Sequence, residues 1–246
     1  MSDTTAATWR LSDLANPTRF IALADRLIPW LAALSIVALA IGLIPGLQAE
    51  DKYQGVTVRI MYIHVPFAWL SMFCYSVMAL AALGTLVWRH PLADVALKAA
   101  APIGACFTAL ALITGSIWGR PMWGAWWVWD ARLTSELILF FLYLGFMALQ
   151  AAIDDPRRAD KAGAILALVG VVNIPIIYFS VKWWNTLHQG SSVNLAKSSM
   201  ATTMLWGMLL MALAFWMYSI AVALMRVRAI ILERERHTEW VKHAVA

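Results

Sequence analysis

Charged residues are scarce in this sequence. Only 13% of the 246 residues are Asp, Glu, Lys or Arg, whereas soluble domains carry about 25%. Hydrophobic residues make up 62% of the chain, against about 45–50% in an ordinary soluble domain. These proportions exclude a soluble fold. They predict an all-α integral membrane protein built as one domain with short loops.

Cysteine and the common catalytic motifs are also scarce. The two cysteines, Cys74 and Cys106, both fall in apolar stretches, so we expect buried small side chains and no disulfide or metal pair. The sequence has no Walker A loop, no G-x-G-x-x-G, no H-E-x-x-H and no C-x-x-C-H. It therefore cannot hydrolyse ATP through a P-loop of its own, and we expect a carrier or binding protein that is not an enzyme.

Long apolar runs separated by short polar breaks dominate the chain. A membrane-spanning helix needs about 20 apolar residues, and the breaks leave room for six such helices. The domain boundaries that follow are an N-terminal segment 1–26, a six-helix membrane domain 27–227 and a tail 228–246. The spans are predicted at about Leu27–Leu47, Met61–Trp88, Leu97–Ile117, Leu133–Ile153, Ala162–Val181 and Thr202–Val227.

The distribution of basic residues predicts the orientation of the bundle. Six spans place both termini on one side of the membrane, together with 13 of the 19 Lys and Arg residues. The other six basic residues fall on the opposite side. Basic residues in short loops favour the cytoplasm. We therefore predict cytoplasmic termini and an external loop at 118–134.

Tryptophan is concentrated in that external loop, which reads W-G-R-P-M-W-G-A-W-W-V-W-D-A-R-L-T. An interfacial aromatic belt would place tryptophans evenly at both membrane faces, which does not explain such a cluster. A surface of indoles beside charged groups suits a large, flat, apolar ligand with charged edges. Our working hypothesis for this ligand is haem. The candidate external tryptophans are Trp118, Trp123, Trp126, Trp127, Trp129, Trp183 and Trp184.

Charged residues on the external side provide candidate partners for the ligand's edges. Arginine pairs with carboxylates in a bidentate way, so Arg120 and Arg132 are candidates to hold the haem propionates, and Arg59 is a further candidate cofactor-binding residue. Asp130 directly precedes the fourth span, where its carboxylate could cap the helix, or hold Arg132 or an indole N–H. Glu136, one turn further, is interpreted as structural support for the helix start.

Five histidines are present, and two of them fall on the external side. His64 lies in Y-I-H-V-P at the start of the second span, and His188 lies in W-W-N-T-L-H-Q-G, 124 residues later. A neutral imidazole is a good axial ligand for haem iron. A histidine at a membrane interface is more often a simple polar side chain, but the tryptophans beside this pair favour a ligand role.

The fifth span contains a helix breaker. Pro175 predicts a kink there because it lacks an N–H. Asn173, two residues earlier, is interpreted as a packing device between helices.

The segment W-G-A-W-W-V-W-D-A-R-L-T-S-E-L resembles the WWD signature of haem-handling membrane proteins. The six-span layout and W-W-N-T-L-H-Q-G resemble the cytochrome c maturation protein C family, CcmC, over nearly the whole of 27–227. By this resemblance, His64 and His188 match the axial haem ligands. The residues that match the WWD signature are Trp123, Trp126, Trp127, Trp129, Asp130 and Arg132.

The resemblance also implies a function. Proteins of that family hold haem b (iron protoporphyrin IX) on the periplasmic side of the bacterial inner membrane. They deliver it to the haem chaperone CcmE, beside an ABC transporter of CcmA and CcmB and with the small protein CcmD. Two alternatives stay open from the residues themselves. One is a b-type cytochrome electron-transfer subunit, and the other is a structural or permease subunit of an ABC transporter.

Overall fold

The computed structural model describes residues 15–188, 190 and 198–245. Within these ranges the chain forms helices and loops, and no β-strand. Six helical segments are long and apolar enough to cross a membrane, so the predicted all-α, six-span fold is confirmed. These segments are Pro17–Gln48, Val56–Trp88, Ala93–Trp123, Ala131–Ala152, Pro156–Trp183 and Thr202–Arg234.

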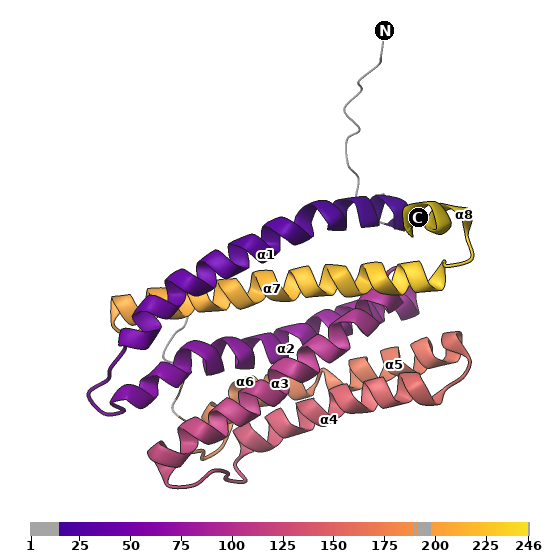
Figure 1. Ribbon diagram of the computed structural model, residues 1–246. Coiled ribbons are helices and arrows are strands. Elements are labelled where there is room, and N and C mark those ends of the chain that lie inside the picture. The colour runs from indigo at the N-terminus through magenta and orange to yellow at the C-terminus, as the bar shows by residue number, and fades with distance from the viewer. Residues whose placement is uncertain (1–14, 189, 191–197, 246) are drawn as a thin grey trace.

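The helices form an elongated bundle in which α2 and α3 occupy the middle (Figure 1). α1 packs along α7 on one side of this central pair, and α4, α5 and α6 cover the other side. The bounds are α1 Pro17–Gln48, α2 Met61–Leu83, α3 Ala93–Trp123, α4 Ala131–Ala152, α5 Pro156–Gly170, α6 Asn173–Trp183, α7 Thr202–Arg234 and α8 Glu239–Val245.

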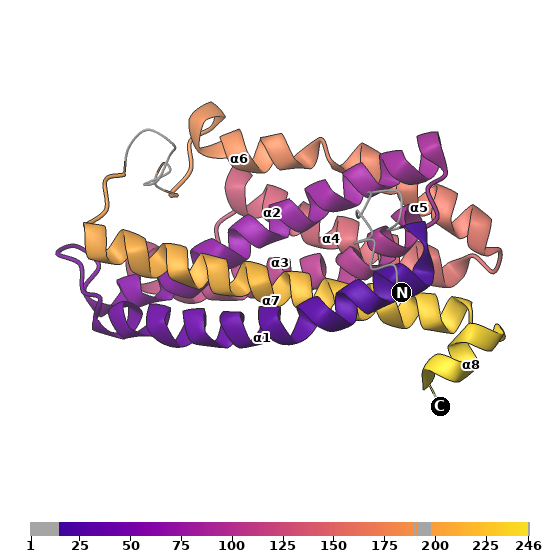
Figure 2. The same ribbon diagram turned by 90° about the horizontal axis from the view of Figure 1, so that it is seen from above.

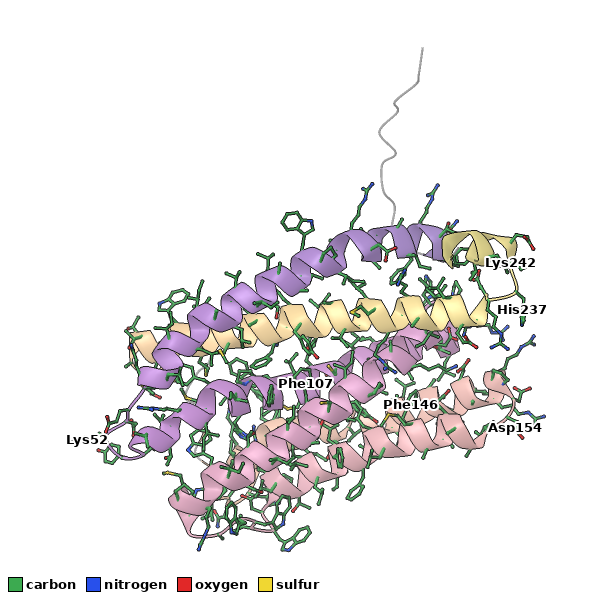
Figure 3. All side chains as sticks on the ribbon, viewed as in Figure 1. Lys52, Phe107, Phe146, Asp154, His237 and Lys242 are labelled. Carbon is green, nitrogen blue, oxygen red and sulfur yellow. The ribbon has the colours of Figure 1, made fainter. Side chains whose placement is uncertain are left out.

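The two ends of the bundle differ in what they carry. The start of α1 and the end of α7 lie together at one end (Figure 1), as an even number of spans requires. The opposite end, which we call the tryptophan end, holds the connections 49–60 and 124–130 and the described residues 184–188, 190 and 198–201. In Figure 3, Lys52 marks the tryptophan end, and Asp154, His237 and Lys242 lie at the other.

Several helices extend beyond their predicted bounds, and capping residues mark two of these ends. α1 starts at Pro17, ten residues before the predicted span, because the Asn16 side chain accepts from the N–H of Thr18 at 3.0 Å. α3 continues past Ile117 to Trp123 despite Pro121. It ends only at Gly124, whose φ of +76° is a left-handed conformation that glycine adopts readily.

The fifth span breaks where a kink was predicted. α5 ends at Gly170 and α6 begins at Asn173, with Pro175 in the first turn of α6. The Asn173 amide donates to the Ser135 carbonyl of α4 at 2.8 Å, which confirms its role in helix packing. The break lets α6 follow its own direction at the tryptophan end.

One expectation about the cysteines was wrong. Cys74 is buried, but Cys106 is exposed on the outer surface of α3. A small, weakly polar thiol is tolerated in lipid as well as in a core, so composition alone could not distinguish the two environments.

A candidate ligand cavity at the tryptophan end

The tryptophan end contains a cavity of about 740 Å³ between α2, α3, α6 and the start of α7. This volume falls within the roughly 300–1,000 Å³ of typical small-molecule sites. The lining is largely apolar and aromatic, with a few polar groups. It includes His64, Trp69, Met72, Trp118, Met122, Trp123, Arg132, Tyr178, Lys182, His188, Met200 and Met208.

Helical periodicity explains which side chains reach the cavity. On α3, the lining positions are 115, 118, 119, 122 and 123, which share one helix face. On α2, they are 61, 64, 65, 69 and 72, again one face. The extra turn of α3 beyond Ile117 is therefore what brings Trp118 and Met122 into the cavity wall.

His64 has one ring nitrogen engaged and one without a partner. Its Nδ1 lies 3.1 Å from the Thr114 hydroxyl of α3. That hydroxyl is 2.7 Å from the Leu110 carbonyl, to which it donates. Thr114 must then accept from His64, which places the proton on Nδ1. Within the described residues Nε2 has no hydrogen-bond partner, so its lone pair is available to a ligand.

His188 is held in the same way by the residue that starts α4. Asp130 caps α4 by accepting the Leu133 N–H on Oδ1 at 2.8 Å. Its Oδ2 accepts from the Thr186 hydroxyl at 2.5 Å and faces His188 Nδ1 at 3.3 Å. An Nδ1–H that donates to a carboxylate leaves Nε2 as the free lone pair. Asp130 therefore binds His188, and within the part of the chain that the structure describes it has no hydrogen bond to Arg132 or to an indole N–H.

Electrostatics favour the neutral imidazole and the ionised carboxylate. Burial lowers the pKa of His188, and the facing Asp130 carboxylate opposes this shift only in part. Burial alone would raise the pKa of Asp130, but hydrogen bonds from the Thr186 hydroxyl, the Leu133 N–H and the His188 ring bring it below its ordinary value. A neutral histidine beside a carboxylate is the form that ligates a metal.

Two tryptophans meet the two histidines edge to face. Trp118 contacts His64 with ring centroids 5.7 Å apart, and Trp123 contacts His188 at 4.7 Å. The Trp118 indole N–H donates to the Gln54 side chain at 3.1 Å, which fixes the ring. These contacts restrict how each imidazole can rotate.

Arg132 brings positive charge to the cavity wall. Its one hydrogen bond within the described residues runs to the Ile177 carbonyl at 3.3 Å. A guanidinium has five N–H donors. The remaining donors beside a largely apolar cavity suit a carboxylate on a bound ligand.

Glu136, one turn beyond Arg132 on α4, is buried and not at the helix surface. It accepts from the Ser71 hydroxyl of α2 at 2.7 Å. The interpretation as support for the helix start therefore understates it, since Glu136 ties α4 to α2. Buried ionisable groups inside membrane spans are rare and usually functional.

The structure separates the remaining predicted residues from this cavity. Trp127 and Trp129 line a second, shallow groove between α3 and α4 with Leu112, Ile113 and Leu137. Arg59 donates to the Ala49 carbonyl at 2.9 Å, and Arg120 donates to the Gly124 carbonyl. The tryptophans that remain exposed outside the cavity are Trp126, Trp183 and Trp184.

Several lining residues were missed from the sequence: Trp69 and Met72 on α2, Met208 on α7 and Tyr178 on α6. For Trp69 and Met72, the sequence did contain a usable signal. Met61, His64, Val65, Trp69 and Met72 have helical spacing, so a helix through His64 brings both to its face.

Comparison with known proteins shows which family this chain belongs to. The family model described as "CcmC: Heme exporter protein C" matches residues 10–242. The chain belongs to this family. It is 62% identical over 226 residues to heme exporter protein C of Bradyrhizobium diazoefficiens, covering 91% of this chain and 86% of that protein.

Two further relatives carry the same name. Heme exporter protein C of Escherichia coli K12 is 49% identical over 245 residues, covering 96% of this chain and 97% of that protein. Heme exporter protein C of Rhodobacter capsulatus is 42% identical over 226 residues, covering 90% and 93%. The resemblance recognised from the WWD segment is thus confirmed at the level of the family.

Proposed function

We propose that this protein binds haem in the cavity at the tryptophan end and delivers it for cytochrome c maturation. The family name and the names of the relatives support a role in haem export. The observation that carries the proposal is the shared cavity of His64 and His188, each with Nδ1 engaged by a neighbour. The two imidazoles thereby present free Nε2 lone pairs to one space.

Each part of haem has a chemical counterpart in the cavity. His64 and His188 are proposed as axial ligands of the iron, which suits neutral imidazole. Arg132 is proposed to hold a propionate, with Lys182 as a second cation on the cavity wall. Trp118 and Trp123 flank the ligating rings, and the methionines offer soft apolar surface to the porphyrin.

The exposed part of the WWD segment is proposed to face the recipient. Trp126 and Trp129 are 60% and 76% exposed, outside the cavity but on the loop that ends in Asp130. A chaperone that docks on these indoles would touch the segment holding His188 in place. Transfer of haem to CcmE, beside CcmA, CcmB and CcmD, follows from the family resemblance and is part of the proposal.

The cellular location is proposed on the charge distribution. Short-loop basic residues are concentrated at the end where α1 starts and α7 ends, which favours the cytoplasm. The tryptophan end would then face the periplasm of the bacterial inner membrane, and haem would be held on that side. The protein is proposed to act as a carrier, with domains 1–26, 27–227 and 228–246 as assigned from sequence.

The test is haem content and the visible spectrum of protein purified in detergent. We expect His64→Ala and His188→Ala each to lose bound haem or change its spectrum. His90→Ala, an exposed histidine at the opposite end, should retain both. Unchanged haem content and spectrum in both cavity variants would refute the axial assignment. Reduction of bound haem by quinol would favour a b-type cytochrome instead.

A further inference from the structure

The cavity continues along α2 beyond the two histidines. His64 lies one turn into α2, while Trp69 and Met72 lie five and eight residues further. At 1.5 Å per residue, Met72 is roughly 12 Å deeper in the bundle than His64. The lower part of the cavity is therefore at the level of the membrane spans and not of the external loops.

The face of α2 that lines this lower part of the cavity continues onto the exposed surface of the bundle. Trp69 and Met72 are half-buried, whereas Phe73 and Leu80 are 44% and 68% exposed. Positions 69, 73 and 80 are spaced by four and seven residues, so they share one face of α2. The wall of the cavity thus continues as a stripe facing lipid.

α7 covers that stripe only in part, and Phe73 and Leu80 stay exposed. α6 packs mainly on α4, and α7 packs on α1, α2 and α3, but the described parts of α6 and α7 share no extensive interface. Figure 2 shows α2 lying between them. Tyr178 of α6 and Met208 of α7 nevertheless line the same cavity, which therefore spans the interval between the two helices.

The lower edge of this interval is defined by an aromatic stack. Phe73 of α2 stacks on Trp216 of α7 with centroids 4.8 Å apart and planes 21° from parallel. Trp216 lies eight residues, roughly 12 Å, further along α7 than Met208. α2 and α7 also meet above the stack, where Phe67 contacts Phe215 at 4.8 Å, so the interval lies between α6 and α7 over the surface of α2.

We propose that the cavity opens sideways to the lipid between α6 and α7, and that haem reaches it from the membrane through this opening. The inference rests on the proposed function, since it names the route of the same ligand. Haem dissolves in a bilayer with its apolar edge inward and its carboxylates toward the surface. That orientation matches a cavity with Arg132 and Lys182 near the tryptophan end and Trp69 and Met72 deeper.

The test uses a bulky label to obstruct the proposed opening without changing a residue that lines the cavity. Phe73→Cys carries a bulky pyrene maleimide at the lower edge, and Leu80→Cys carries the same group on the same stripe seven residues deeper. Both are made with Cys106→Ala to remove the exposed native thiol. Each reconstituted protein then takes up iron protoporphyrin IX from phosphatidylcholine vesicles, and the change in the visible spectrum is followed with time.

We expect labelled Phe73→Cys to load about tenfold more slowly than its unlabelled form, because the label obstructs association. Labelled Leu80→Cys should load as fast as its unlabelled form, and all four should reach the same final spectrum. Equal rates for the two labelled proteins would overturn the lateral route and leave the proposed function intact. Failure of even the unsubstituted protein to develop a haem spectrum would refute the proposed function and the route with it.

Discussion

Asp130 performs two tasks with two oxygens, and substitutions can separate them. Oδ1 caps α4 through the Leu133 N–H, while Oδ2 faces Thr186 and His188. Asn keeps a cap-competent carbonyl oxygen but removes the negative charge, whereas Ala removes both. Asp130→Asn therefore perturbs the contacts to Thr186 and His188 but keeps the cap, and Asp130→Ala perturbs both.

The expected magnitudes follow from these contacts. Loss of a partner that orients a ligating histidine typically lowers metal affinity by about 10–100-fold, equivalent to roughly 1.4–2.8 kcal/mol. Loss of an N-cap side chain costs about 1 kcal/mol of stability. We expect Asp130→Asn to weaken haem retention by that factor with little change in stability, and Asp130→Ala to show both effects.

Asp155 supplies a matched control. It caps α5 with the same geometry, accepting the Arg158 N–H on Oδ1 at 2.8 Å, and lies at the opposite end of the bundle. Asp155→Ala should lose about 1 kcal/mol of stability yet keep its haem. The assay is haem titration in detergent, paired with thermal unfolding. If Asp130→Asn retains haem like the unsubstituted protein, the carboxylate does not support His188 and the reasoning fails.

Three other predictions test the rest of the cavity. Because burial lowers the pKa of His188, haem retention should be constant from about pH 8 to 6.5. Retention should fall only at lower pH, where protons compete with iron for the imidazole and also favour the unfolded chain. A pH series of visible spectra checks this. Gly115→Ala puts a Cβ 3.0 Å from His64 Cε1 and should shift the spectrum, whereas Gly145→Ala, with its nearest neighbour at 3.8 Å, should not. Arg132→Gln should weaken retention by about tenfold or more, and Arg120→Gln, outside the cavity, should leave it unchanged in the same titration.

The sequence predicted the six spans because hydropathy over about 20 residues is a local property. Capping by Asp130 and packing by Asn173 were also foreseeable, since both depend on a residue's own type and its place next to a helix. The sequence did not show that the loop tryptophans divide between the cavity, the second groove and the exposed surface. That division depends on α3 continuing through Pro121 to Gly124, which a composition-based boundary at Ile117 could not anticipate.

Long-range contacts limited the prediction of the site. Nothing local to His188 shows that its Nδ1 meets Asp130, 58 residues away, or that His64 shares its cavity. The burial of Glu136 was missed for the same reason, because its partner Ser71 lies on another helix. The span pattern placed the two histidines on the same side of the membrane, and the family resemblance matched both to axial haem ligands, but neither gave the contacts that hold each ring.

The geometry bears on how a carrier could both hold and release haem. His64 sits on α2, braced by Thr114 on the adjacent α3, inside the packed bundle. His188 sits on a loop and depends on Asp130, which terminates the exposed WWD segment. A partner that binds Trp126 and Trp129 would act on the loop side first. Displacing Asp130 would weaken the His188 bond while His64 kept the iron in place. Under the proposed function, the two ligands would then leave in order, and transfer would proceed without haem becoming free.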